Sequence, residues 1–163
     1  MGPLALLVLR ITQRCNLACR YCYAAGERET AEEDMTAEMA IRAVEEACPP
    51  GGTLKIQFTG GEPLLNLPVM EAVWQYGQRS GRHLRLAVQT NGTLLTPQTL
   101  RALERMGCAL GVSLDGNGDA NGLRVFLMEN QPFRPSSRVS GRWRGQGCAV
   151  ISPQWCRMSA HRI

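Results

Sequence analysis

The sequence predicts an α/β protein with a parallel sheet, and two observations lead to this fold class. Four short apolar segments recur along residues 4–116, and the gaps between them contain apolar residues at helical spacing. Each gap is also long enough to hold a helix, which a parallel crossover requires. This β-α-β-α-β-α-β order implies right-handed connections and leaves two architectures open, an open doubly wound sheet and an α/β barrel.

The first strand is expected at Leu4–Thr12, a nearly continuous apolar run of the kind found in strands buried on both faces. No basic region precedes this run and no A-x-A-like site follows it, so it is interpreted as a strand and not as a signal peptide. A helix is expected over Ala37–Cys48, because Thr36 can cap it and the Pro-Pro-Gly-Gly run at residues 49–52 ends it. Its apolar face comprises Met39, Ala40, Ala43, Val44 and Ala47.

The later elements are bounded by similar signals. A second helix is expected from about Pro68, a residue suited to the first turn, with Gly81 as its C-cap. A third helix begins after Thr96 and Pro97, an N-cap and a proline at the first helical position, and stops at Gly107. The strands that alternate with these helices are expected at Thr53–Thr59, Leu84–Thr90 and Cys108–Asp115.

Composition and charge divide the chain near residue 116. The 163 residues suffice for one domain, and no run approaches the roughly 18 apolar residues that a membrane helix needs. Residues 1–122 hold 11 basic and 13 acidic residues, whereas residues 123–163 hold 7 arginines and one acid. Because no regular pattern of aromatic residues accompanies these arginines, nucleic-acid binding is not expected. Residues 1–116 are predicted to form the folded core, and residues 117–163 a poorly ordered tail.

Three of the seven cysteines, Cys15, Cys19 and Cys22, lie within eight residues. A disulfide framework would spread its cysteines through a small secreted chain, so this clustering favours metal chemistry in a reducing compartment, and the cytoplasm is the expected location. Thiolates bind zinc or iron–sulfur clusters, and a structural zinc site usually has four protein ligands. No fourth ligand is near in sequence, and His83 and Cys48 qualify only if the fold brings them close.

Other motifs that suggest chemistry follow the remaining strands. "TGGEP" begins at Thr59 after the second strand, "QTNG" ends the third strand, and "SLDG" ends the fourth. In α/β folds with parallel strands, functional loops gather at the carboxyl ends of the strands. Three thiols, two glycines beside a carboxylate, an amide, a hydroxyl and a second carboxylate are therefore expected at one edge of one sheet.

Cys15-x-x-x-Cys19-x-Tyr21-Cys22, together with Gly60-Gly61-Glu62-Pro63, resembles the radical S-adenosylmethionine (SAM) superfamily over about residues 4–116. The resemblance implies a partial α/β barrel and two cofactors, a [4Fe–4S] cluster and SAM. It also implies that an electron from the cluster cleaves SAM to methionine and a 5′-deoxyadenosyl radical, which abstracts a substrate hydrogen. The chain is similar to the branch that matures peptides and sulfatases, whose members usually carry a SPASM extension. That branch implies a peptide or protein substrate and an electron donor such as flavodoxin or ferredoxin.

By the same resemblance, the three cysteines are the cluster ligands, and Tyr21 shields the cluster or touches the adenine. The Gly60–Glu62 segment holds the SAM amino group, which is reasonable because glycines let backbone carbonyls approach closely and a carboxylate can accept from an ammonium. Arg124 is a candidate for a carboxylate-binding arginine. The positions expected near SAM or the substrate are Asn91, Ser113 and the candidate catalytic Asp115.

The family pattern stops after about residue 117, with four recognisable strands where the family generally has at least six and with no SPASM cysteine set. We therefore expect a truncated or frameshifted continuation and an unpaired edge at the fourth strand. A chain of this kind is expected to bind a cluster yet to be unstable or inactive, because radical chemistry needs water excluded. Two alternatives stay open: a non-catalytic module that uses the same thiols for zinc, and an inactive fragment.

Overall fold

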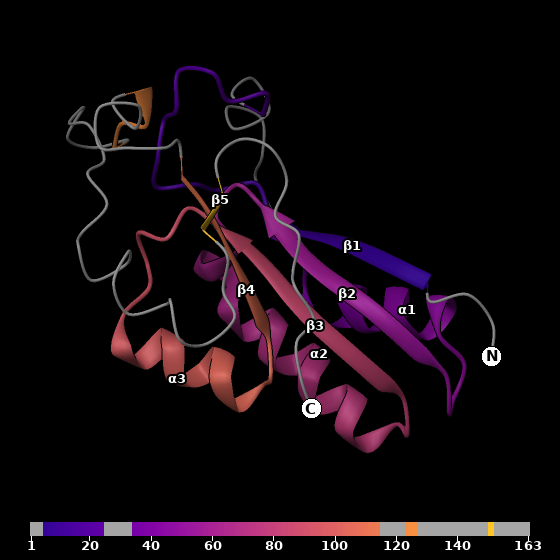
Figure 1. Ribbon diagram of the computed structural model, residues 1–163. Helices are drawn as coiled ribbons and strands as arrows, with labels where there is room; N and C mark the ends of the chain where they lie inside the picture. Colours follow the sequence, from indigo (N-terminus) through magenta and orange to yellow (C-terminus); the bar gives the residue numbers. More distant parts are fainter. Residues whose placement is uncertain (1–4, 25–33, 115–122, 127–149, 152–163) are drawn as a thin grey trace.

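The computed structural model describes residues 5–24, 34–114, 123–126 and 150–151, which form one parallel sheet with helices (Figure 1). Its strands follow the chain order and are β1 (Ala5–Thr12), β2 (Thr53–Gly60), β3 (His83–Thr90), β4 (Ala109–Ser113) and β5 (Val150–Ile151). The helices are α1 (Ala37–Ala47), the short 3-10 helix η1 (Pro63–Asn66), α2 (Leu67–Arg79) and α3 (Pro97–Arg105). The predicted α/β fold with a parallel sheet is confirmed, whereas the candidate catalytic Asp115 lies outside the described residues.

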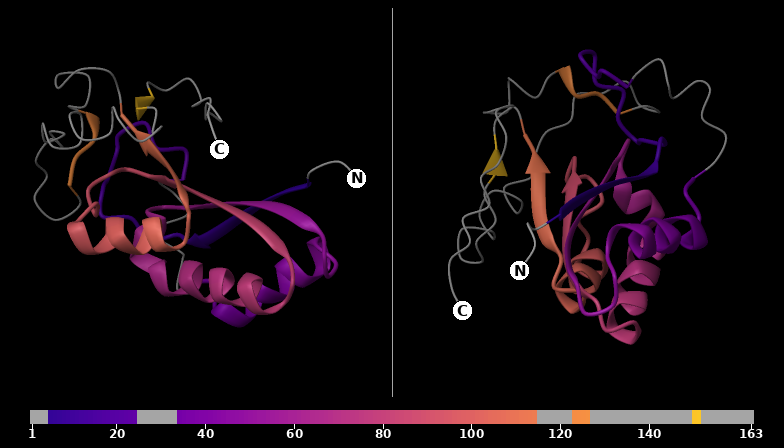
Figure 2. Two further views of the ribbon diagram at one scale, coloured as in Figure 1. Left: turned by 60° about the horizontal axis from the view of Figure 1, so that its bottom comes forward. Right: turned by 90° about the vertical axis from the view of Figure 1, so that its right-hand side faces the viewer.

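All three α-helices cover the same face of the sheet, as Figure 2 shows. Neighbouring strands pair in parallel along the chain, β1 with β2, β2 with β3 and β3 with β4. Right-handed crossovers that always advance in one direction return each helix to the same side, whereas a doubly wound sheet reverses direction and covers both faces. The strand order therefore decides in favour of a partial α/β barrel.

The core lies between the sheet and the helices. The fully buried residues of β2 are Leu54, Ile56 and Phe58. Val44 of α1 and Met70 of α2 belong to the same apolar cluster, and full burial of one such side chain stabilises the fold by roughly 1.5–3 kcal/mol. On the other face of β1, which no described helix covers, Leu6 and Val8 are 54% and 53% exposed.

The helix ends predicted from capping residues are confirmed. The Thr36 hydroxyl oxygen accepts a hydrogen bond from the Met39 N–H at 3.2 Å, and that of Thr96 accepts one from the Thr99 N–H at 3.2 Å. Gly107 has a φ of 59°, a left-handed conformation that ends α3 at the expected place. Local sequence signals therefore determine where these helices begin and end.

The prediction of an unpaired edge at the fourth strand is wrong. In the structure β5 pairs with β4 in parallel, Val150 with Val112 and Ile151 with Ser113. Valine and isoleucine are β-branched and favour strands, so these two residues suit an added edge even though the surrounding tail shows no strand period. The tail thus contributes to the sheet.

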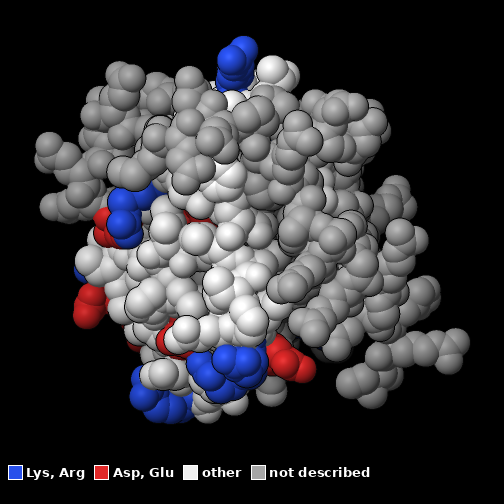
Figure 3. Space-filling view, turned by 90° about the vertical axis from the view of Figure 1, so that its left-hand side faces the viewer, with Lys and Arg blue, Asp and Glu red and all other residues white. Residues whose placement is uncertain are grey.

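Charged side chains lie mainly at the margins of the face in Figure 3, and the described centre of that face is mostly uncharged. Basic and acidic side chains lie close to one another at the left and lower margins, and the described part of this face carries no broad basic patch. Within the described ranges, no helix has the length and apolar character needed to cross a membrane.

Candidate functional site at the carboxyl edge of the sheet

A cavity of about 240 Å³ opens between the loop after β1 and the carboxyl ends of β2, β3 and β4. The loop lines it with Cys15, Cys19, Tyr21 and Cys22. The strand ends line it with Gly60, Gly61, Asn91 and Ser113. The predicted site residues that the structure describes therefore lie at one edge of the sheet, and all of them except Glu62 line the cavity.

The three cysteines are of intermediate exposure, and no disulfide joins them to one another or to another described cysteine. The Cys22 N–H donates to the Cys19 carbonyl at 3.1 Å, which folds this part of the loop into a tight turn. Leu17, between the first two cysteines, is fully buried in the core and anchors the loop to the sheet. Three thiols lining one cavity are a donor set suited to iron–sulfur chemistry, so these residues fit the cluster that the motif implies.

The two candidates for a fourth zinc ligand are far from this loop. His83 begins β3 and donates its backbone N–H to the Gly52 carbonyl, and Cys48 follows the end of α1, so both lie at the amino edge of the sheet. Among residues 5–24, 34–114, 123–126 and 150–151, no three His, Cys, Asp or Glu side chains stand together as a metal-ion site. The three thiols therefore line one cavity without converging on a single metal ion, and the described residues offer no closed four-ligand zinc site.

The end of β2 approaches the cysteine loop so closely that residue 61 must be glycine. A Cβ at Gly61 would lie 2.3 Å from the Arg14 carbonyl oxygen, a distance that real Cβ atoms do not show. Two backbone hydrogen bonds hold this approach, from the Gly61 N–H to the Thr12 carbonyl at 2.9 Å and from the Glu62 N–H to the Arg14 carbonyl at 2.8 Å. This packing role is separate from the cofactor contact expected of the motif.

The Glu62 carboxylate is not directed at the cavity, in contrast to the prediction that it could accept from the SAM amino group. Its side chain is fully buried, and Oε1 accepts from the Leu64 N–H at 3.1 Å and the Thr90 hydroxyl at 2.7 Å. Oε2 accepts from the Asn91 N–H at 2.8 Å. Burial raises the pKa of Glu62, and these three hydrogen bonds oppose that rise. Glu62 therefore joins β2, the unpredicted helix η1 and the turn after β3.

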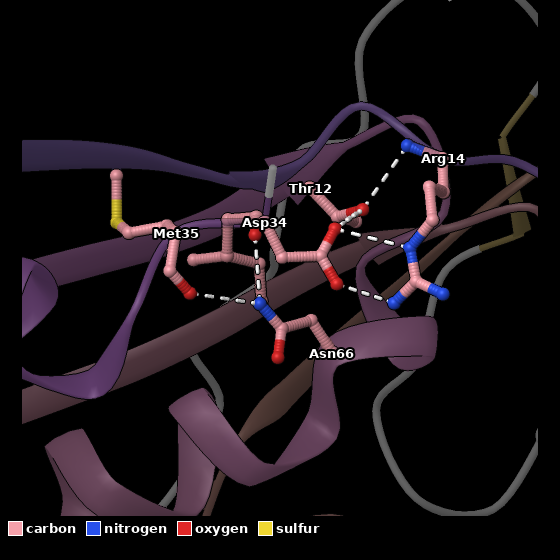
Figure 4. Close-up of polar contacts among 6 residues, drawn as sticks. Thr12, Arg14, Asp34, Met35 and Asn66 are labelled. Carbon is pink, nitrogen blue, oxygen red and sulfur yellow. Dashed lines mark hydrogen bonds and ion pairs between the residues drawn. The ribbon is translucent and has the colours of Figure 1, made fainter. Parts of the chain in front are cut away.

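A polar cluster that the sequence did not predict holds the start of the cysteine loop (Figure 4). The Thr12 hydroxyl donates to Asp34 Oδ1 at 2.6 Å, and the Arg14 guanidinium forms an ion pair with the same carboxylate. The hydrogen bond from Arg14 holds the pKa of Asp34 below its ordinary value. Asn66 donates through Nδ2 to the Met35 carbonyl at 3.1 Å and to a carbonyl of β1 at 2.8 Å. Both ends of the β1–α1 connection are therefore tied together.

Residues 123–126 pair with the cysteine loop, although no pattern in the sequence after residue 116 predicted this pairing. The backbone N–H groups of Ala18 and Arg20 donate to two carbonyls of this segment at 2.7 and 3.0 Å. Arg124 is 8% exposed and lines the cavity, and its guanidinium lies 5.7 Å from the centroid of the Tyr21 ring. The segment thereby brings a largely buried cation to the three thiols.

Comparison with known proteins identifies the family of this site. The model of the radical SAM superfamily matches residues 9–135. The chain belongs to this superfamily. It is 36% identical over 138 residues to the GTP 3′,8-cyclase of Parasynechococcus marenigrum, covering 80% of this chain and 38% of the cyclase. It is 36% identical over 154 residues to the AdoMet-dependent heme synthase of Methanosarcina barkeri, covering 84% of this chain and 43% of the synthase.

A solved structure, native anSMEcpe with bound AdoMet (SAM) and Cp18Cys peptide, is similar to this radical SAM chain with a TM-score of 0.62. The two are 27% identical, and the match covers 77% of this chain and 36% of anSMEcpe. The chain thus spans less than half the length of each relative named here. Radical SAM homologues are enzymes that use a [4Fe–4S] cluster and SAM, which are the two cofactors that the cysteine and Gly-Gly-Glu-Pro motifs predicted.

Proposed function

We propose that this radical SAM chain binds a [4Fe–4S] cluster through Cys15, Cys19 and Cys22 and binds SAM in the adjoining cavity, in order to modify a peptide or protein. The observation that carries the proposal is that three thiols from one loop and polar groups from three strand ends line one cavity. When bound, the cluster would supply the electron that cleaves SAM to methionine and a 5′-deoxyadenosyl radical, which abstracts a substrate hydrogen.

The strand ends supply groups suited to the polar parts of SAM. At the rim of the cavity, Gly60 and Gly61 leave the backbone accessible, and carbonyl oxygens there can accept hydrogen bonds from an ammonium group. The Ser113 hydroxyl accepts from Gln89 Nε2 at 2.7 Å, which holds that hydroxyl at the cavity. These residues therefore bind and orient SAM beside the thiols.

Arg124 is well placed to bind the SAM carboxylate. Its guanidinium is largely buried, contacts the Tyr21 ring and lines the same cavity as the cysteines. A guanidinium binds a carboxylate with two parallel hydrogen bonds, and charge-assisted bonds of this kind are about twice as strong as neutral ones. Arg124→Met is therefore expected to weaken SAM binding about 10-fold or more, whereas Arg124→Lys keeps part of the affinity.

Anaerobic reconstitution of the 163-residue chain with ferrous iron and sulfide tests the core of the proposal. We expect about four iron atoms per chain, and 5′-deoxyadenosine when SAM and dithionite are added. Cys19→Ala should lose the iron, and Cys108→Ala, which changes a cysteine at the amino end of β4, should keep it. One zinc and no iron after anaerobic purification would support the zinc module instead. A loaded cluster without SAM cleavage would leave a fragment that binds but does not react.

The peptide or protein substrate is supported by the likeness to anSMEcpe, whose structure contains a bound peptide. The curated relatives include a GTP cyclase and a heme synthase, so substrate classes differ among similar chains. SAM consumption should therefore be compared with a cysteine-containing peptide and with GTP. Stimulation by the peptide alone is expected, and stimulation by GTP or by neither contradicts the substrate class. A flavodoxin or ferredoxin as electron donor and a cytoplasmic location complete the proposal.

A further inference from the structure

Asn91 lies in a small polar network beside the first cysteine of the loop. Its Nδ2 atom is 3.8 Å from Cys15 Sγ and donates to Asn16 Oδ1 at 3.0 Å. The Leu17 backbone N–H donates to the same sulfur at 3.4 Å. Cys15 Sγ therefore accepts from the Leu17 backbone of its own loop and from the Asn91 side chain in the turn after β3.

A hydrogen bond from a backbone N–H determines which end of the Asn91 amide is the oxygen and which is the NH2 group. The Thr93 backbone N–H donates to Asn91 Oδ1 at 2.9 Å, and the Thr93 hydroxyl donates to it at 2.6 Å. Because a backbone N–H can only donate, the atom it contacts is the amide oxygen, and the NH2 group must be the end that faces Cys15. The Thr93 hydroxyl oxygen also accepts from Asn16 Nδ2 at 2.7 Å, which closes a ring of hydrogen bonds.

The backbone of Asn91 is held as firmly as its side chain. Its N–H donates to the buried Glu62 carboxylate at 2.8 Å, and the residue is only 8% exposed. In such a desolvated position a hydrogen bond is electrostatically stronger than in water. The amide is therefore a fixed donor to the sulfur.

We infer that the Asn91 amide, held by Thr93 and Asn16, donates to the Cys15 thiolate and raises the reduction potential of the cluster that this thiolate binds. Hydrogen bonds to cluster sulfurs stabilise the reduced state, because it carries more negative charge than the oxidised state. The inference rests on the proposed cluster site, and it gives Asn91 a positioning and tuning role that is separate from contact with SAM.

The test is a redox titration of the reconstituted 163-residue chain, followed by electron paramagnetic resonance. It is performed without SAM, so that any contact between Asn91 and SAM cannot contribute. Asn91→Ala should shift the midpoint potential to a more negative value, and Asn91→Asp should shift it further, because a negative charge replaces the donor. Arg82→Ala is the control: the Arg82 side chain also donates a hydrogen bond, to the Cys48 backbone carbonyl at 2.7 Å, but at the amino edge of the sheet, so its loss should leave the potential unchanged.

An Asn91→Ala potential equal to that of the wild type, at equal iron content, overturns the inference. If Asn91→Ala loses its iron, Asn91→Asp replaces it, since aspartate keeps an acceptor for the two Thr93 donors but removes the NH2 donor to Cys15. A more negative potential supports the inference, and an unchanged potential overturns it. A wild-type chain that takes up no cluster would contradict the proposed function itself, which keeps the two failures distinct.

Discussion

The Glu62 carboxylate and the Asn91 backbone N–H lie 2.8 Å apart, and this hydrogen bond joins the end of β2 to the turn after β3. The same buried carboxylate accepts from Thr90 and Leu64. Glu62 therefore sets the spacing between two sides of the cavity. Within the Gly-Gly-Glu-Pro motif of this chain, the two glycines line the cavity, whereas Glu62 is buried beneath it and binds the neighbouring backbone.

Glu62→Gln should reduce the free energy of unfolding by about 1–3 kcal/mol, because the amide NH2 leaves at least one of the three buried donors without an acceptor. Urea denaturation of the cluster-free chain measures this. Glu71→Gln is the control, since Glu71 forms an exposed ion pair with Arg105 whose loss costs about 1 kcal/mol or less. Equal effects of the two changes would contradict a structural role for Glu62.

Gly61→Ala should displace the cysteine loop, because the new Cβ would lie 2.3 Å from the Arg14 carbonyl oxygen. We expect a loss of about 1–3 kcal/mol in stability and a lower iron content after reconstitution. Gly81→Ala is the matched control, since its φ of 66° makes alanine strained but no atom lies within 4 Å of the added Cβ. That variant should lose about 1–2 kcal/mol and keep its iron. Full iron content in Gly61→Ala would show that the loop tolerates the shift.

Asp34→Asn should make the chain less stable by about 0.2–1 kcal/mol at pH 7, since Arg14 and Thr12 both bind the carboxylate at a partly exposed position. The pKa of Asp34 is lowered in the folded state, so its stabilisation is fully present above the ordinary value of 3.8 and is lost as the pH falls through the lowered pKa. Denaturation of both chains between pH 7 and pH 2.5 measures this. A difference that vanishes near pH 6 would point to another group.

Thiol reactivity should separate the cavity cysteines from the core cysteines in the cluster-free chain. Burial raises the pKa of Cys108 to about 12, and Cys48 is 2% exposed, so both should react slowly with iodoacetamide at pH 8. Cys15, Cys19 and Cys22 line the cavity and should react before Cys48 and Cys108. Peptide mapping by mass spectrometry identifies the modified residues. Early modification of Cys108 would contradict the packing at the amino end of β4.

Local sequence signals were sufficient to predict the strands of residues 4–116, the helix caps and the position of the motifs at one edge of the sheet. Thr36 and Thr96 cap the helices they precede, and parallel strand direction brings Cys15 and Ser113 to one cavity. The roles of Glu62 and Asp34 depend instead on which way a side chain points across the fold, and no local spacing carries that information. Asp115 and the domain boundary at residue 116 stay predictions.

The antiparallel bridge between Leu17 and Phe126 also bears on the order in which the protein assembles during translation. Strands β1 to β4 each pair with the next strand along the chain, so they can associate in turn as they leave the ribosome. The cysteine loop, although made early, obtains its partner only after residue 126 has emerged. Until then the loop lacks its pairing with residues 123–126. We therefore expect iron to be incorporated most efficiently into chains that have been released from the ribosome.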